Sequence, residues 1–238
     1  MSSPSALSLV IESWLRRGVV DTVRHLAEEQ SFDRVHGVRT TGRVPVERLV
    51  KRVESAWPDT SEYQPVPAAL FRAALAAVPA AARAGAFVDL GCGKGRALVM
   101  AAEAGFRHVR GVELARPLAC QAELNAEAVA SRLGVTLEWR LEVADAAERA
   151  FDPDETCVFL FNPFGRLVLR RVLDRLSRSL AAHPRAAAVI YVNPQHLEVL
   201  AESRALTEHS LGKTRIGGVL DWAVYVSRCT GEMGLGRR

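Results

Sequence analysis

Apolar residues are distributed along the chain in two different patterns. Short strand-like runs rich in apolar residues occupy residues 86–90, 108–113, 135–143, 156–161 and 187–192. Between several of these runs, apolar residues recur at every third or fourth position. Continuous runs are typical of buried strands, whereas a spacing of three to four is typical of amphipathic helices. The alternation predicts an α/β fold, in which crossover helices connect the strands of a parallel sheet.

A glycine-rich turn follows the first of these runs. The turn Gly-Cys-Gly-Lys-Gly spans residues 91–95 and leads into a helical pattern at 96–103. Glycine has no Cβ, so the backbone here can turn tightly and approach a ligand closely. A strand-to-helix turn also presents unpaired backbone N–H groups. The turn therefore predicts a ligand-binding loop; the alternative is that its glycines only pack the helix against the strand.

Two acidic residues follow later strands of the predicted sheet. Glu113 ends the second strand, 20 residues beyond Gly93, which is the offset at which a βαβ unit places an acid against ribose hydroxyls. An ionised carboxylate only accepts hydrogen bonds, so it suits a vicinal diol. Asp145 lies just past the third strand and is a second candidate, although Asp-Ala-Ala-Glu-Arg could equally be a helix N-cap.

Two classes of cofactor fit such a unit, dinucleotides and S-adenosylmethionine. A dinucleotide fingerprint is Gly-x-Gly-x-x-Gly, but its third glycine falls on Arg96 here. Asp89 stands two residues before the first glycine, where its charge repels a pyrophosphate. The same carboxylate suits a ligand that carries a sulfonium and an ammonium group. The residues therefore favour S-adenosylmethionine.

At this point the chain resembles the class I S-adenosylmethionine-dependent methyltransferases. Residues 88–95 resemble the first motif of that family, Glu113 its ribose-binding acid and Asp145 its adenine-side acid. The resemblance implies a Rossmann-like sheet of seven strands with the last one antiparallel. The C-terminal runs 205–211 and 219–226 fit the final hairpin, joined through Gly212, Gly217 and Gly218. The cofactor-binding residues that it implies in this domain are Asp89, Gly91, Cys92, Gly93, Gly95, Glu113, Leu114, Asp145 and Asn162.

The segment Asn162-Pro163-Phe164 stands where this family has its fourth motif. In amino-group methyltransferases with Asn-Pro-Pro-Tyr or Asn-Pro-Pro-Phe, the Asn oxygen and a Pro carbonyl accept hydrogen bonds from the target amine, and the aromatic ring packs on the substrate. One proline is missing here. Asn162 and the Pro163 carbonyl can still form this clamp, but the resemblance does not imply where the Phe164 ring lies. The alternative is that Asn-Pro simply ends a strand.

The resemblance implies methyl transfer from S-adenosylmethionine, and the fourth motif favours an amine nitrogen of a small metabolite or a protein side chain as acceptor. Methylation of oxygen and a non-catalytic, cofactor-binding regulatory protein are the alternatives. No residue is an obvious general base. His196 follows the fifth strand and could take a proton, although an exposed histidine at a helix start explains it as well. Tyr191 is expected to lie in the core.

Residues 1–84 are expected to form a helical cap that precedes the methyltransferase domain at 85–238. Helical spacing occupies residues 6–29, 46–57 and 67–82. The loops between them, Arg39–Arg43 and Tyr63–Pro67, are similar to loops in a group of bacterial class I methyltransferases. That similarity implies that the loops cap the methionine end of the cofactor, with Thr41 and Tyr63 as candidates. The helices could form a lid, a substrate wall or a homodimer contact.

Composition narrows the range of partners. The net charge is +4, and the arginines of 166–178 lack interleaved aromatic residues, so a solvated helix face is expected and nucleic acid is disfavoured. The four cysteines form no C-x-x-C pair, which disfavours zinc and a disulfide framework. No leader pattern and no run of about 18 apolar residues is present, so the expected location is the cytoplasm.

Overall fold

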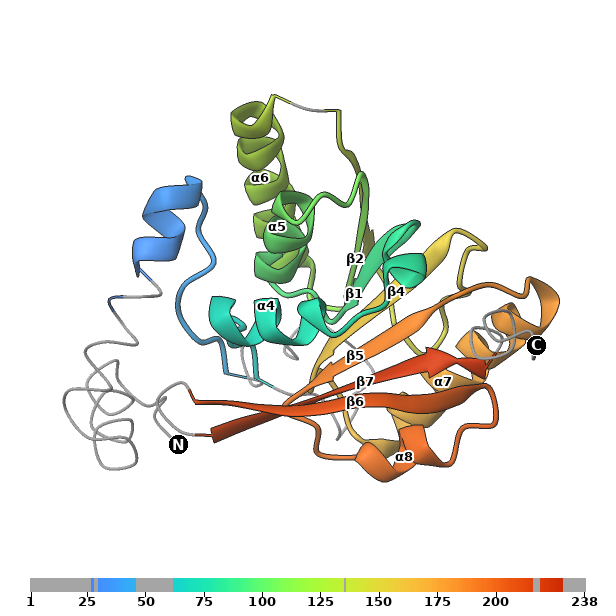
Figure 1. Ribbon diagram of the computed structural model, residues 1–238. Coiled ribbons are helices and arrows are strands. Elements are labelled where there is room, and N and C mark those ends of the chain that lie inside the picture. The colour runs from blue at the N-terminus through green and yellow to red at the C-terminus, as the bar shows by residue number, and fades with distance from the viewer. Residues whose placement is uncertain (1–26, 28–29, 46–61, 135, 216–218, 229–238) are drawn as a thin grey trace, which may run out of the picture.

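The computed structural model describes residue 27 and residues 30–45, 62–134, 136–215 and 219–228 (Figure 1). A sheet of seven strands in the order β3-β2-β1-β4-β5-β7-β6 forms its centre. The strands are β1 Ala86–Leu90, β2 His108–Glu113, β3 Glu138–Val143, β4 Glu155–Phe161, β5 Ala188–Val192, β6 Leu206–Arg215 and β7 Val219–Ser227.

The directions of the strands confirm the expected Rossmann-like α/β sheet. The pairs β1–β2, β2–β3, β1–β4 and β4–β5 are parallel, whereas β7 is antiparallel to both β5 and β6. The chain moves outward in one direction from β1 to β3 and then in the other direction from β4. The strand order therefore reverses between β1 and β4, and ligands of open α/β sheets bind at such a reversal.

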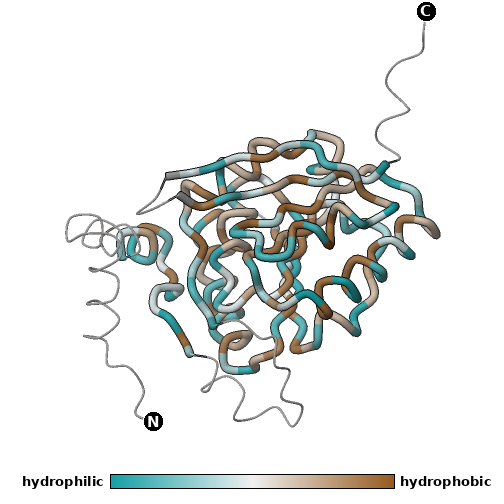
Figure 2. The backbone as a smooth tube through the Cα atoms, turned by 90° about the horizontal axis from the view of Figure 1, so that it is seen from below, coloured by the Kyte–Doolittle hydropathy of each residue, from teal (hydrophilic) through white to brown (hydrophobic). Residues whose placement is uncertain are grey.

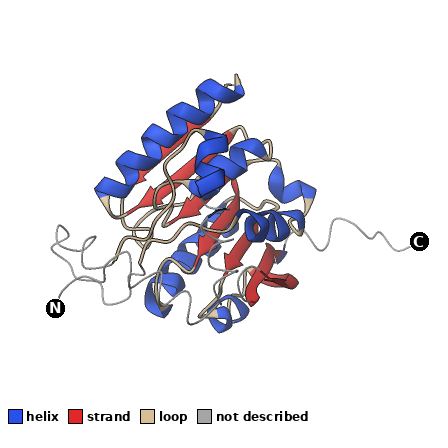
Figure 3. Ribbon diagram, turned by 90° about the vertical axis from the view of Figure 1, so that its left-hand side faces the viewer, coloured by secondary structure: helices blue, strands red, loops and turns tan. Residues whose placement is uncertain are grey.

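Helices cover both faces of the sheet (Figures 1 and 3). They are α4 Ala68–Ala76, α5 Arg96–Glu103, α6 Arg116–Leu133, α7 Arg166–Ala182 and α8 Leu197–Ala201, with a 3-10 turn, η1, at Ala80–Arg83. On the face of α4 and α5, the rings of Phe71, Phe87 and Phe159 pack against one another. On the other face, α7 buries one stripe of Val and Leu side chains beneath the sheet. The apolar segments gather in the interior (Figure 2).

Most predicted elements are found within a few residues of their expected bounds. The helical pattern at 67–82 divides into α4 and η1, and Pro79 stands directly before η1. Gly212 was expected in the turn of the last hairpin, but this was wrong, because it lies inside β6. A Cβ at this position would come within 2.0 Å of the Trp222 ring, so close packing explains the glycine. The pattern at 46–57 and nearly all of 6–29 lie outside the described residues, and the division at residue 84 stays a prediction.

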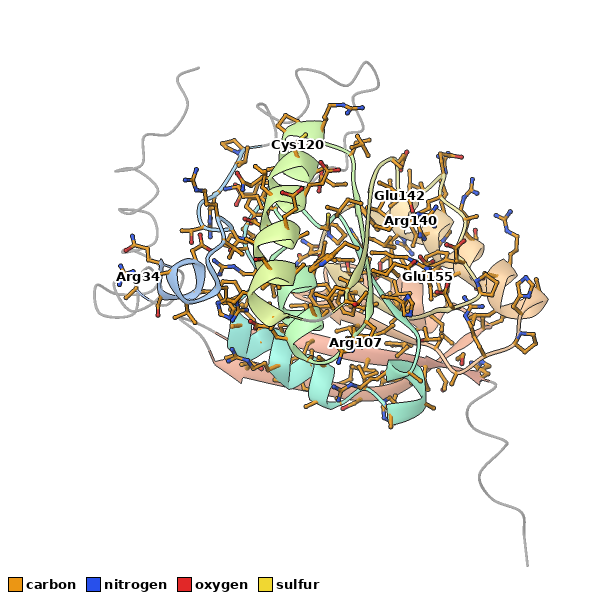
Figure 4. The ribbon with its side chains drawn as sticks, turned by 90° about the horizontal axis from the view of Figure 1, so that it is seen from above. Arg34, Arg107, Cys120, Arg140, Glu142 and Glu155 are labelled. Atoms are coloured by element: carbon orange, nitrogen blue, oxygen red, sulfur yellow. The ribbon has the colours of Figure 1, made fainter. Side chains whose placement is uncertain are left out.

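The connection from β3 to β4 contains no helix, although a helical crossover was expected there. Charged side chains hold this loop instead. Glu155 is fully buried and accepts hydrogen bonds from the Arg149 guanidinium, while Arg110 Nη1 lies 3.2 Å from Glu155 Oε1. Figure 4 shows Glu155 beside Arg140 and Glu142, on the opposite side of α6 from Arg34. Together with the burial of Ala147 and Phe151 in the apolar core, these ion pairs order the loop without a helix.

Candidate functional site

The carboxyl ends of the parallel strands bring most of the predicted site residues to one edge of the sheet. Asp89 and the glycine loop end β1, and Glu113 ends β2. Asn162 follows β4, next to β1 in the sheet. The β1–β4 reversal therefore lies at the centre of the predicted residues.

The glycine loop is packed so tightly that two of its positions accept no side chain. Gly91 has φ 81°, and a Cβ there would lie 2.5 Å from Cβ of Pro163. Gly93 has φ 56°, and a Cβ there would lie 2.3 Å from two ring carbons of Tyr63. The loop is thus in contact with the β4 corner on one side and with the N-terminal segment on another.

Glu113 is tied to the glycine loop through its carboxylate. Its Oε2 accepts a hydrogen bond from the backbone N–H of Gly93 at 2.8 Å, and its Oε1 accepts one from Ala115 at 2.8 Å. Burial raises the pKa of Glu113, and hydrogen bonds from Ala115, Gly93 and Leu114 backbone groups partly oppose that shift. The 20-residue offset therefore brings this acid to the loop, as the sequence indicated.

Asp89 is the more unusual of the two acids. Asp89 is 4% exposed. No described residue donates a hydrogen bond to its carboxyl group or forms an ion pair with it. Burial, and then the nearby charge of Glu113, raises the pKa of Asp89 well above its usual range. The pKa of the buried Cys92 thiol is raised as well, by burial first and then by the two carboxylates. The described surroundings thus hold two buried acids without a neutralising cation, which favours a cationic ligand.

The corner that follows β4 contains the predicted fourth motif. Asn162 has φ 41°, and its Oδ1 accepts a hydrogen bond from the Tyr191 hydroxyl at 3.4 Å. Pro163 contacts the glycine loop, as described above. Phe164 is buried in the apolar cluster beneath α7, together with Val168. Asn162 and Pro163 therefore lie at the β1–β4 reversal, whereas the Phe164 ring packs in the core, and its contact with a substrate stays a prediction.

Two of the other polar candidates, Asp145 and His196, lie on surface turns, whereas Tyr191 is buried. Asp145 accepts a hydrogen bond from the Ala147 backbone N–H at 2.8 Å, which closes a turn rather than a helix. It also lines a hollow of about 330 Å³ whose remaining walls are mostly charged. His196 stands directly before α8, with Nδ1 3.7 Å from Glu198 Oε1. Tyr191 is 1% exposed and lies in the core, as expected.

Thr41 and Tyr63 meet at the glycine loop although they are far apart in the sequence. Tyr63 donates a hydrogen bond from its hydroxyl to the Thr40 carbonyl at 2.6 Å, and its ring covers Gly93. Lys94 Nζ donates to the Thr41 carbonyl at 2.8 Å and lies 5.0 Å from the centre of the Tyr63 ring. The two loops do converge on the predicted pocket, and their contact with a cofactor stays a prediction.

Sequence reasoning missed the residues that fasten residues 38–45, here called the N-terminal strap, to the rest of the molecule. Arg96 is 3% exposed, donates to Thr40 Oγ1 at 2.6 Å and lies over the Phe32 ring. Asp33 accepts hydrogen bonds from the backbone N–H groups of Thr40 and Thr41, both at 2.8 Å. Figure 1 shows this part of the chain beside α5 and α6. The position of Arg96, directly after the glycine turn, was the available signal.

Asn125 on α6 completes this attachment. It is 2% exposed, accepts a hydrogen bond from the Arg39 backbone N–H at 2.8 Å and donates to the Lys94 carbonyl at 2.8 Å. One amide thus joins the N-terminal strap to the glycine loop. Its place on the apolar face of a helical pattern could have indicated it, because a buried polar side chain requires partners.

The described part of the chain contains no group of three or more His, Cys, Asp or Glu side chains placed to hold a metal ion. Among the helices that the structure describes, none combines the length and the apolar character that crossing a bilayer requires. The arginines of α7 are largely paired, for example Arg170 with Glu202 at 2.6 Å and Arg175 with Glu148 at 2.8 Å.

No family model and no curated protein sequence matches the chain. Among solved structures it is similar to a proposed tRNA methyltransferase from Streptococcus pneumoniae, at 17% identity and a TM-score of 0.50, over 72% of this chain and 73% of that one. It is also similar to a geranyl diphosphate C-methyltransferase from Streptomyces coelicolor, at 16% identity and a TM-score of 0.48, over 67% of this chain and 80% of that one. The strand order, the antiparallel β7 and the first of these likenesses agree: the chain has the fold of the class I S-adenosylmethionine-dependent methyltransferases.

Proposed function

We propose that the protein is an S-adenosylmethionine-dependent methyltransferase that transfers the methyl group to an amine nitrogen. The observation that carries the proposal is the pair of buried carboxylates, Asp89 and Glu113, on either side of a glycine loop at the β1–β4 reversal. S-adenosylmethionine contributes the sulfonium and ammonium charges that such a pocket lacks. A dinucleotide brings a pyrophosphate, which the Asp89 carboxylate repels.

The residues that hold the cofactor have distinct roles. Glu113 accepts hydrogen bonds from the ribose hydroxyls, for which each of its carboxylate oxygens has a further lone pair beside the backbone bond that it already accepts. Asp89 lies toward the cationic end of the ligand. The backbone N–H groups at the start of α5 are available to the methionine carboxylate. Tyr63 and Thr41 cover the loop from the N-terminal side.

The bound cofactor supplies an already activated methyl group, so the protein contributes alignment and exclusion of water. Asn162 Oδ1 and the Pro163 carbonyl accept hydrogen bonds from the acceptor amine and hold its lone pair in line with the methyl carbon. The contact between Pro163 and Gly91 keeps this corner against the cofactor loop. The methyl acceptor is a small metabolite or a protein side chain. The cytoplasmic location of the protein and its homodimer contact stay predictions.

Binding of S-adenosylhomocysteine, measured by isothermal titration calorimetry, tests the proposal. We expect wild-type protein to bind it, and Glu113→Ala to weaken binding at least tenfold, because two ribose hydrogen bonds to a charged acceptor are lost. Glu127→Ala is the matched control, since Glu127 is an exposed acid on α6. Stabilisation by NAD but not by S-adenosylhomocysteine in a thermal shift assay contradicts the proposal.

A further inference from the structure

The corners that follow β4 and β5 have the same sequence and lie next to each other. Asn162-Pro163 follows β4, and Asn193-Pro194 follows β5. In the parallel pairing of these strands, Phe161 is the partner of Val192, so the two Asn residues are the next pair along. Neighbouring parallel strands are about 4.8 Å apart. Two Asn residues therefore stand next to each other along the edge of the sheet that carries the predicted site.

Both corners have an unfavourable backbone conformation. Asn162 has φ 41° and Asn193 has φ 49°, and they are the described non-glycine residues with positive φ. Each also precedes a proline, which favours extended backbone in the residue before it. Such conformations are maintained where the surrounding structure enforces them, and they cluster at functional sites.

The two amides differ in their partners. The backbone N–H of Asn193 donates to the Asp221 carbonyl at 2.8 Å, which fixes this corner to β7. The side-chain amide of Asn193 has no hydrogen-bond partner among the described residues, although it is partly buried. Its oxygen is therefore available to a ligand.

Tyr191 fixes the orientation of the other amide. Its hydroxyl oxygen accepts a hydrogen bond from the Gln195 backbone N–H at 3.3 Å, and its O–H group donates to Asn162 Oδ1 at 3.4 Å. Because a backbone N–H can only donate, the hydroxyl proton is directed toward Asn162. Burial also raises the pKa of Tyr191, so this proton is retained at neutral pH. Asn162 Oδ1 keeps one lone pair for a substrate.

We infer that Asn162 and Asn193 form one acceptor site, in which Asn193 Oδ1, in place of the Pro163 carbonyl, is the second hydrogen-bond acceptor for a primary amine substrate. This inference rests on the proposed function and narrows its substrate class to amines with two N–H groups. Each amide oxygen accepts one N–H, which leaves the nitrogen lone pair free. That pair forms the N–CH₃ bond, the S–CH₃ electron pair stays on sulfur, and the surplus proton on nitrogen leaves to water.

The test uses sinefungin, an analogue in which an amine-bearing carbon replaces the methylsulfonium group. Its amine occupies the position of the reacting groups, so its affinity relative to S-adenosylhomocysteine reports the acceptor site without a known substrate. We expect Asn193→Gly to weaken sinefungin binding about tenfold and to leave S-adenosylhomocysteine binding within twofold, because one hydrogen bond to a charged amine is lost. Glycine is chosen because it keeps the positive φ without strain.

Two further variants sharpen the comparison. Asn193→Asp keeps an oxygen acceptor and is expected to retain the preference for sinefungin. Gln195→Ala alters an exposed neighbour and keeps the backbone N–H, so it serves as the matched control. An unchanged affinity ratio in Asn193→Gly overturns the inference, as does an equal loss of both ligands, which indicates a structural role. If wild-type protein fails to bind S-adenosylhomocysteine, the proposed function fails and this inference fails with it.

Discussion

Gly93 carries two separate constraints at a single position. Its φ of 56° is unfavourable for any residue with a Cβ, and the Tyr63 ring fills the space into which a Cβ would project. Gly134 has nearly the same φ, 60°, but nothing lies within 4 Å of the Cβ position. The two glycines therefore separate the cost of the backbone conformation from the cost of the clash.

We expect Gly134→Ala to lower the free energy of unfolding by about 1 kcal/mol, the usual cost of left-handed backbone. Gly93→Ala should cost about 2–4 kcal/mol, because overpacking against the Tyr63 ring adds to the cost of the left-handed backbone. In a Tyr63→Ala background, the cost of Gly93→Ala should fall to that of Gly134→Ala. Urea denaturation of the four variants measures this, and additive effects of Gly93→Ala and Tyr63→Ala contradict the contact.

At the scale of elements, the N-terminal strap is held by side chains and by one backbone bridge, between Val44 and Tyr63. Burial alone raises the pKa of Asp33, but hydrogen bonds from Thr40 and Thr41 outweigh burial and lower it. Arg96 joins this arrangement from the first residue of α5, with Nη2 3.4 Å from Asp33 Oδ1. Arg96 is therefore expected to make a large contribution to the attachment of the strap, beside Asn125 and Tyr63.

Arg96→Met should release the strap, because methionine keeps the apolar stem but donates no hydrogen bond. We expect the amides of residues 38–45 to exchange at least tenfold faster in hydrogen–deuterium exchange, while those of β1 and β4 are unchanged. Arg107→Met, at an exposed arginine before β2, is the matched control. Equal exchange of the strap in Arg96→Met and wild type shows that other contacts hold it.

The sequence predicted these elements unevenly, for physical reasons. Strands such as β1 and β5 are buried on both faces, so they appear as continuous apolar runs, and both were placed to within a residue. The helix expected in the β3–β4 connection was wrong, because this loop is ordered by the Arg149–Glu155 ion pair and by isolated buried side chains such as Phe151, which have no helical period. The residues that fasten the strap were missed for the same reason, since Asp33 alone resembles a solvated acid. The sequence motif was enough to name Asn162 as a candidate. It could not name Asn193, because the position of Asn193 next to Asn162 follows from the register of β4 and β5.

At the scale of the whole molecule, the buried acids oppose folding of the free protein. The pKa of Asp89 is raised in the folded state, so its contribution to stability is fully present below the unfolded pKa of about 3.9 and is lost as pH rises through the folded value. Asp154 behaves in the opposite way: the Arg110 guanidinium lowers its pKa, and stability is lost as pH falls. Once the pH exceeds the raised pKa of Asp89, the free protein therefore maintains a buried negative charge that is unfavourable until a cationic ligand binds.

Asp89→Asn should remove this unfavourable charge. We expect the free variant to be more stable than wild type by about 1 kcal/mol or more at pH 8, with a smaller difference at pH 5, because one pKa unit corresponds to about 1.4 kcal/mol. The same variant should bind S-adenosylmethionine more weakly, and its affinity should no longer rise with pH. Urea denaturation and calorimetry at both pH values measure this. A variant that is less stable than wild type at pH 8 contradicts the account.

The place of β7 in the sheet has a consequence for synthesis of the chain. Among the strands that the structure describes, β7 is the last to leave the ribosome, yet it is inserted between β5 and β6, which precede it in the chain. Until residues 219–227 emerge, one edge of the fully buried β5 has no partner. Unpaired apolar edges recruit other strands, so nascent chains are most exposed to aggregation and to chaperones during this interval. A released chain that ends before residue 219 should therefore remain in an open, chaperone-bound form.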